Sequence, residues 1–310
     1  MTNPISKPGV QGSPLTASLS ESFRSNSISH ESLVPLKLSL SQLTTLRWSL
    51  SEEVFQLKET GFDAIGLWRP KLVEFGEERA AELFHEYNLK ASSLSFAGAF
   101  TGGRGFSYLE AIADGNEAIR QAQMVGSDNV IVVGGSQNGH TNRHCRRMVV
   151  DAMRALGDAA AKGGVKLCLL PMHQVFRDSW TFLNTLDSAL DMLAEIAHPH
   201  VRLAIDAYQL SDETDLVERI PEIVESVGIV QVSGGNRSPK SERDRSLPGK
   251  GEIPVKEIIQ AFQSAGYAGY FDIQVWSDRV WQSNYSHLIE QVHATVKAMS
   301  HQTIIRAQSD

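Results

Sequence analysis

Asp206 is the residue whose position in this sequence best suits a functional role, because it ends a short apolar run. The run Val201–Asp206 is apolar and β-branched, which is typical of a strand buried on both faces. A carboxylate at the end of such a strand needs a partner or a water-lined cavity. Two interpretations stay open: Asp206 caps the next loop or helix, or it belongs to a functional site.

The second interpretation needs other polar side chains at the same edge of the fold. Several residues with suitable side chains lie where neighbouring predicted strands end. They are Trp68 and Arg69 after the second strand, His173 after the fifth, Gln209 after the sixth, Gln231 on the seventh, Arg245 in the following loop, and Gln274 on the eighth. We expect this set to line the rim of one site.

Each of these side chains also has a plainer interpretation. Trp68 suits packing between a strand and a helix, and His173 suits hydrogen bonding within a loop. Arg69 and Arg245 suit solvated surface charges, and the charges of residues 240–245 alternate in sign. These alternatives stay open at this point.

Eight apolar runs alternate with helical patterns along the chain. The predicted strands are residues 36–40, 63–68, 89–96, 129–133, 165–170, 201–206, 228–232 and 270–275. The predicted helices are residues 51–61, 76–87, 108–125, 143–161, 179–196, 216–226, 254–265 and 285–299. Strict alternation without hairpin signals predicts a parallel sheet.

Eight strand–helix units of this length favour an α/β fold with a single (β/α)8 TIM barrel, which typically has about 250 residues. A doubly wound open sheet is the rival. Such a sheet usually has a glycine-rich phosphate-binding loop after its first strand, and residues 41–45 contain no glycine. In a barrel, the site forms where the strands end.

Composition limits the function classes. The chain has 310 residues, is 42% hydrophobic and 21% charged, and carries a formal net charge of −7. We therefore expect neither nucleic acid nor a membrane surface as a partner. Cys145 and Cys168 form no metal-binding pattern. We expect a cytoplasmic protein, and a homo-oligomer stays open.

The ends of the chain differ from the predicted barrel. Residues 1–34 contain nine serines, three prolines and only scattered apolar residues. This composition predicts a disordered Ser-rich tail without the apolar core of a secretory signal. We place the barrel at residues 35–302 and a C-terminal tail at residues 303–310.

Several short stretches, in this order and spacing, resemble the xylose isomerase-like TIM barrel family, in its sugar phosphate isomerase/epimerase branch. The resemblance covers about residues 36–300. The stretches are Leu40–Thr45, Ile65–Arg69, Leu169–His173, Phe182–Thr185, Ile205–Gln209, Asp244–Gly251 and Phe271–Asp278. The resemblance implies a (β/α)8 barrel that acts on sugars.

The family typically binds one divalent metal with side chains from strands five to eight, and two glutamates also move the proton between sugar carbons. Carried over by position, these four ligands fall on Leu170, Asp206, Gln231 and Gln274. Only Asp206 keeps its charge. The resemblance therefore implies a degenerate site with no cofactor, or a weakly held divalent metal such as Mn, Mg, Co or Zn.

The proton shuttle is affected even more, because neither Leu170 nor Gln274 can accept a proton near neutral pH. Two substitute bases are conceivable, His173 beyond the fifth strand and Asp272 one layer below Gln274. The expected function is binding of a sugar-like polyol or keto acid without metal-dependent isomerisation. The alternative is an active isomerase or epimerase with an altered base such as His173.

Overall fold

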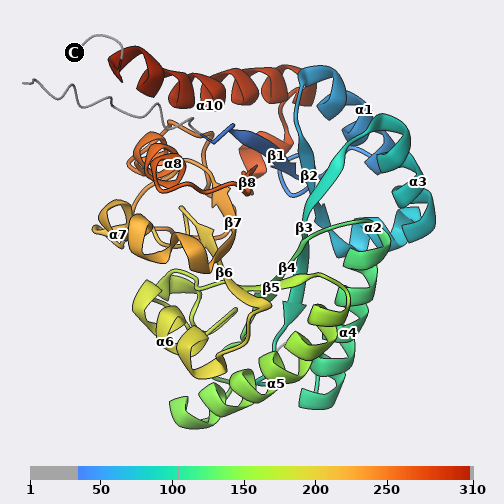
Figure 1. Ribbon diagram of the computed structural model, residues 1–310, viewed down its shortest axis with the longest axis vertical. Helices are drawn as coiled ribbons and strands as arrows, with labels where there is room; N and C mark the ends of the chain where they lie inside the picture. Colours follow the sequence, from blue (N-terminus) through green and yellow to red (C-terminus); the bar gives the residue numbers. More distant parts are fainter. Residues whose placement is uncertain (1–33, 103–104, 308–310) are drawn as a thin grey trace, which may run out of the picture. The chain divides into compact units, whose positions relative to one another are not determined.

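The computed structural model describes residues 34–102 and 105–307, and it contains a closed barrel of eight parallel strands surrounded by helices (Figure 1). The strands are β1 (Lys37–Ser41), β2 (Ala64–Trp68), β3 (Lys90–Gly98), β4 (Asn129–Val133), β5 (Lys166–Leu169), β6 (Val201–Asp206), β7 (Val227–Val232) and β8 (Tyr270–Ile273). Each strand pairs with its sequence neighbours, and β8 closes the barrel against β1. The predicted (β/α)8 TIM barrel is confirmed.

Helices connect successive strands on the outside of the barrel. The helices are α1 (Leu50–Thr60), α2 (Arg69–Phe75), α3 (Glu77–Tyr87), α4 (Tyr108–Met124), α5 (Asn142–Lys162), α6 (Leu186–Ile196), α7 (Leu216–Ile223), α8 (Val255–Ser264), α9 (Asp278–Trp281) and α10 (Tyr285–Ala307), with the 3-10 turns η2 (Gln174–Phe176) and η3 (Val224–Ser226). Their buried apolar faces pack on the outer side of the strands, which completes the core.

The helix predicted at residues 179–196 begins later than expected, at Leu186. Asn184 donates hydrogen bonds to the carbonyls of Met172 and Thr181, 3.0 Å away in both cases, and Thr185 forms a capping box at the start of α6. Side chains of this kind bond to nearby backbone groups and compete with helix formation. Residues 179–185 therefore form a loop over the barrel end.

The C-terminal helix is longer than predicted. α10 continues beyond residue 299 to Ala307, because residues 300–307 contain neither glycine nor proline to stop it. Residues 303–307 of the predicted C-terminal tail are therefore helical, while 308–310 lie outside the described residues. The predicted Ser-rich tail also lies outside them, apart from its last residue, Val34.

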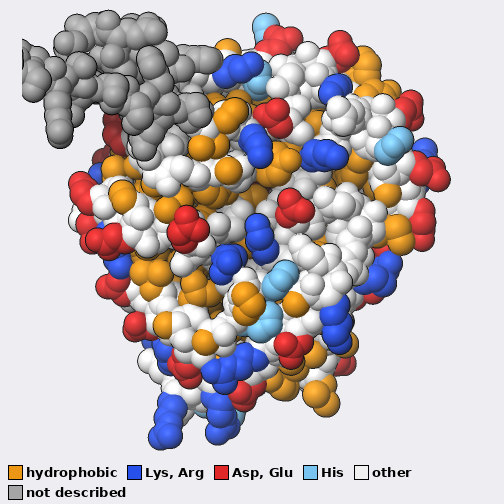
Figure 2. Space-filling view, viewed as in Figure 1, with side chains coloured by type: hydrophobic (Ala, Val, Ile, Leu, Met, Phe, Trp, Pro, Cys, Tyr) orange, Lys and Arg blue, Asp and Glu red, His pale blue; other side chains and the backbone are white. Residues whose placement is uncertain are grey.

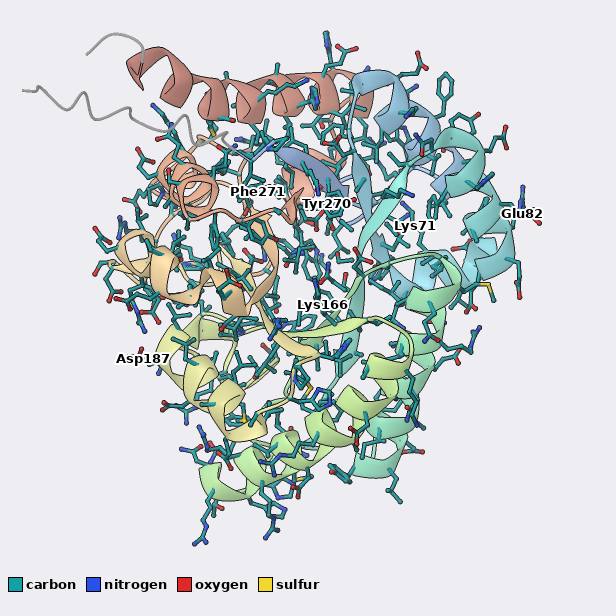
Figure 3. The ribbon with its side chains drawn as sticks, viewed as in Figure 1. Lys71, Glu82, Lys166, Asp187, Tyr270 and Phe271 are labelled. Carbon is teal, nitrogen blue, oxygen red and sulfur yellow. The ribbon has the colours of Figure 1, made fainter. Side chains whose placement is uncertain are left out.

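The visible surface carries charges of both signs. Figure 2 shows acidic and basic side chains interleaved over most of this face. Figure 3 labels two residues that begin strands, Lys166 of β5 and Tyr270 of β8, close to the middle of the same view. None of the helices in residues 34–102 and 105–307 combines the length and hydropathy needed to span a bilayer.

Candidate functional site

The register of the barrel brings polar side chains of four consecutive strands to one level. Asp206 of β6 pairs with Gln231 of β7, Gln231 pairs with Asp272 of β8, and Asp272 pairs with Ser39 of β1. All four side chains are buried, with at most 1% of their surface exposed. Polar groups buried at this depth need hydrogen-bond partners.

Arg245 is the partner of Asp206. Its Nη2 atom lies 2.8 Å from Asp206 Oδ2 and its Nη1 atom lies 3.1 Å from Asp206 Oδ1. The backbone N–H of Tyr208 donates a third hydrogen bond to Asp206 Oδ1 at 2.9 Å. The arginine and aspartate side chains are 2% and 0% exposed, so this is a buried, two-pronged ion pair.

Tyr208, two residues beyond the end of β6, supports this ion pair. The guanidinium carbon of Arg245 lies 4.5 Å from the centre of the Tyr208 ring, a cation–π distance. The Tyr208 hydroxyl donates hydrogen bonds to the Ser241 carbonyl and to Asp244, which tie the loop between β7 and α8 down onto the strand ends. Arg245 is therefore held in place from several sides, which contradicts the interpretation as a solvated surface charge.

A second polar network occupies the β1, β7 and β8 side of the barrel. Gln231 Nε2 donates to Gln274 Oε1 at 2.8 Å and to Asp272 Oδ2 at 3.2 Å, while Ser39 donates to Asp272 Oδ1 at 2.9 Å. Burial raises the pKa of Asp272 to about 6, although hydrogen bonds from Gln231 and Ser39 lower it. A Cβ atom at Gly66 would lie 2.7 Å from the Asp272 carboxylate, so glycine provides the space for it.

Changing Asp272 to asparagine is expected to alter the pH dependence of stability. Because the pKa of Asp272 is raised in the folded state, ionising this buried carboxyl destabilises the fold. The protonated carboxyl therefore leaves the protein at full stability below about pH 4, and this stability is lost as pH rises to about 6. Relative to the parent, Asp272→Asn should therefore gain about 2–3 kcal/mol between pH 4 and pH 7. Urea unfolding at each pH measures this difference.

Glu82 provides the control for that experiment. It is an exposed carboxylate of α3 that points away from the protein in Figure 3, so Glu82→Gln should follow the parent at every pH. An Asp272→Asn variant whose stability also runs parallel to the parent from pH 4 to pH 7 would contradict the raised pKa of Asp272.

His173 lies at the end of the loop that follows β5. Its Nδ1 atom accepts a hydrogen bond from the Val175 backbone N–H at 3.2 Å, and its Nε2 atom lies 3.4 Å from Asp212 Oδ2. Gln209 Oε1 in turn accepts a hydrogen bond from the His173 backbone N–H at 3.1 Å. Both side chains therefore make loop hydrogen bonds, as the plainer interpretation of His173 expects, and their roles towards a ligand stay predictions.

Trp68 and Arg69 stand at the end of β2 and the start of α2. The backbone N–H of Trp68 donates to Gln42 Oε1 at 2.8 Å, and Gln42 donates to the buried Glu53 at 2.5 Å. Burial raises the pKa of Glu53 to about 7, although Lys71 (labelled in Figure 3) lowers it from 2.7 Å away. This network fixes the position of Trp68 at the barrel rim.

A cavity of about 600 Å³ opens beside Trp68 and Arg69. The residues that line it are Leu43, Trp68, Arg69, Pro70, Val73, Phe96, Phe106, Asp114, Trp180 and Trp276. Half of these residues are aromatic. Of the predicted site residues, Trp68 and Arg69 line this cavity, whereas His173, Gln209, Arg245 and Gln274 do not. The predicted rim therefore separates into an aromatic cavity and a buried polar network.

The comparison with protein families agrees with this fold. The sequence model described as "Xylose isomerase-like TIM barrel" matches residues 54–299, which is most of the chain. The chain belongs to the xylose isomerase-like TIM barrel family. The resemblance inferred from short stretches of the sequence is thereby confirmed.

Known proteins are similar to this chain to different extents. A D-psicose 3-epimerase of Enterocloster bolteae is 27% identical over 150 residues, which cover 44% of this chain and 46% of the relative. The matched segment thus spans less than half of that enzyme. A crystal structure of a Sinorhizobium meliloti protein is 26% identical, with a TM-score of 0.76 over 86% of this chain and 97% of that one.

A further solved structure of the same fold contains a metal. The IolI protein, solved with a bound zinc atom, has a TM-score of 0.76 over 86% of this chain and 99% of its own, at 18% identity. At this identity the likeness shows the fold alone. Whether the present chain can hold such a metal depends on its own residues.

These residues do not fit a divalent metal. Both oxygens of Asp206 already accept hydrogen bonds from Arg245, and Leu170 lies in the apolar core without a donor atom. Gln231 and Gln274 bond to each other. Within residues 34–102 and 105–307 there is no group of three or more His, Cys, Asp or Glu residues placed to hold a metal. A metal at Asp206 would first have to displace a buried arginine.

Sequence reasoning missed most of the cavity. Asp114, Phe96 and Phe106 were not candidates, and Trp180 fell within a segment predicted as helix. Phe96 and Trp276 could have been found, because each lies at or just beyond the end of a predicted strand. Asp114 could not, because it lies within α4 and reaches the cavity only through the packing of that helix.

Proposed function

We propose that the protein binds a small sugar-like polyol or keto acid at the barrel mouth and performs no metal-dependent isomerisation. The observation that carries this proposal is the Arg245–Asp206 ion pair, which occupies the only carboxylate among the four family ligand positions. Arg245 supplies a fixed positive charge there. Unlike a metal ion, its guanidinium has no vacant coordination position at which neighbouring substrate oxygens could bind and be polarised.

The chemistry of the other positions supports the same proposal. Moving a proton between neighbouring carbons needs at least one base, and inverting a carbon needs a base at each face of the sugar, but Leu170 and Gln274 cannot act as bases. Asp272 has the raised pKa of a base, but its carboxylate is fully buried and accepts hydrogen bonds from Gln231 and Ser39. The proposal therefore keeps the sugar-type ligand of the family and omits the proton transfer.

The test combines metal content, binding and exchange. Protein purified without chelator is expected to carry well under one equivalent of Mn, Mg, Co or Zn. A thermal-shift screen of sugars and keto acids should give the same stabilising ligands with and without EDTA. The best ligand, incubated with protein in deuterated water, should gain no deuterium at the carbon beside its carbonyl.

Each readout has an outcome that would overturn the proposal. Near-stoichiometric metal, or ligand binding that EDTA abolishes, would show that a metal ion displaces Arg245 from Asp206. Deuterium incorporation would favour the alternative function, an epimerase or isomerase with an altered base. Changing His173 to glutamine and Asp272 to asparagine separately would then identify which residue carries the proton.

A further inference from the structure

The cavity at the barrel mouth has a wall made of aromatic rings. Trp180 lies between two of them, with ring centres 5.6 Å from Phe96 and 6.1 Å from Trp276, both in edge-to-face contact. Trp68 and Leu43 also line this wall. Such a surface favours a ligand with an apolar face, and a few polar groups then set its orientation.

Asp114 is a charged hydrogen-bond acceptor that lines this cavity. It pairs with Arg69, whose Nη1 and Nη2 atoms lie 2.7 and 2.8 Å from its two oxygens, and 29% of the Asp114 side chain is exposed. Each carboxylate oxygen has a second lone pair that can accept a hydrogen bond from another donor. Two neighbouring hydroxyl groups of a ligand would match this pair of acceptors.

Arg69 is already occupied by protein groups. Besides Asp114, it donates to Gln121 Oε1 at 2.8 Å and to the Phe96 carbonyl at 3.1 Å. The charges of Arg69 and Asp114 cancel, and the other described residues that line the cavity are uncharged. A phosphate group would therefore find little compensating charge among the described residues.

The rim of the cavity is apolar and open to solvent. Six large hydrophobic side chains are exposed within the described residues, and two of them, Val73 at 58% and Phe106 at 44%, line this cavity. They come from different elements, α2 and the segment before α4. An apolar substituent of a ligand could cover them while its hydroxyl groups reach Asp114.

We propose that this cavity binds a neutral glycoside: Asp114 accepts hydrogen bonds from two neighbouring sugar hydroxyls, the aromatic wall contacts the sugar face, and Phe106 and Val73 contact an apolar aglycone. The inference rests on the proposed function and deepens it, because it selects an unphosphorylated sugar with an apolar substituent from the wider class of sugar-like ligands.

The test compares matched probes by isothermal titration calorimetry. The probes are phenyl and methyl glycosides of several hexoses and the 6-phosphates of the same hexoses. Phenyl glycosides are expected to bind about tenfold more tightly than methyl glycosides, and the phosphates more weakly than either. Asp114→Asn should weaken every glycoside about tenfold, because one charged acceptor is lost.

Two matched controls separate specific from general effects. Glu117→Gln removes another arginine-paired carboxylate of α4, one that does not line the cavity, and should leave binding unchanged. Phe106→Ala should abolish the preference for phenyl over methyl, whereas Phe55→Ala, at an exposed phenylalanine of α1 outside the cavity, should not. Because Phe106 is exposed, this variant keeps the test valid even if Asp114→Asn fails to fold.

The outcomes separate the two proposals. Glycosides that bind regardless of Asp114→Asn and Phe106→Ala would overturn this inference and leave the proposed function standing. Tighter binding of the sugar phosphates would also overturn it. If no sugar, glycoside or keto acid binds, the proposed function falls and this inference falls with it.

Discussion

Changing Arg245 to alanine is expected to lower the free energy of unfolding by about 3–5 kcal/mol, the usual effect of removing one partner of a buried ion pair. Asp206 is fully buried, so among the described residues its carboxylate would keep only the hydrogen bond from the Tyr208 backbone. The packing of the guanidinium on the Tyr208 ring would also be lost. Urea unfolding of parent and variant measures the difference.

Arg243 provides a matched control two residues earlier in the same loop. It pairs with Asp278 at 3.6 Å, and both side chains are about three-fifths exposed. Exposed ion pairs contribute little, so Arg243→Ala should cost less than about 1 kcal/mol. If Arg245→Ala is as mild as Arg243→Ala, Arg245 does not neutralise Asp206 in the folded protein, and the main support for a metal-free site disappears.

Restoring a metal site is expected to need three changes, Leu170→Glu, Gln274→Glu and Arg245→Ala. The first two return carboxylates to the family ligand positions, and the third frees the oxygens of Asp206. Without metal, the three carboxylates should repel one another and raise at least one of their pKa values, so the variant should be less stable than the parent in EDTA. Manganese or cobalt should reverse this loss.

Metal that binds only the folded state should stabilise the triple variant by about 4 kcal/mol when the free metal concentration is a thousandfold above the dissociation constant. Thermal unfolding with and without metal measures it. The parent should show little or no shift, and the double change that keeps Arg245 should show a smaller shift than the triple change. If the triple variant folds and gains nothing from metal, these positions do not converge on one point.

The barrel was predictable because the sequence pattern of each strand and each helix is local. Buried parallel strands are continuous apolar runs, and each is separated from the next by a helical pattern, as residues 129–133 illustrate. The start of the helix predicted at residues 179–196 was less predictable, although residues 186–196 are helical. Its leucines keep helical spacing, but Asn184 donates a hydrogen bond to the Met172 carbonyl, which is 12 residues away along the chain and is brought close by the fold.

The candidate site also has features that the sequence predicts and features that it does not. The sequence by itself predicted the fold and placed Asp206, Gln231 and Gln274 at or near the ends of strands, whereas the assignment of family ligand positions to Leu170 and Gln274 stays a prediction. Strand position follows from a period of two, which a single sequence displays. It could not determine which charge Asp206 faces, because Arg245 is 39 residues away along the chain.

Only the tertiary structure decided that Arg245 is buried against Asp206, and that Arg69 is paired with Asp114 at an aromatic cavity. The physical reason is that the state of an ionisable side chain depends on burial and on its nearest opposite charge. Both properties arise when loops from distant parts of the chain close over the same end of the barrel.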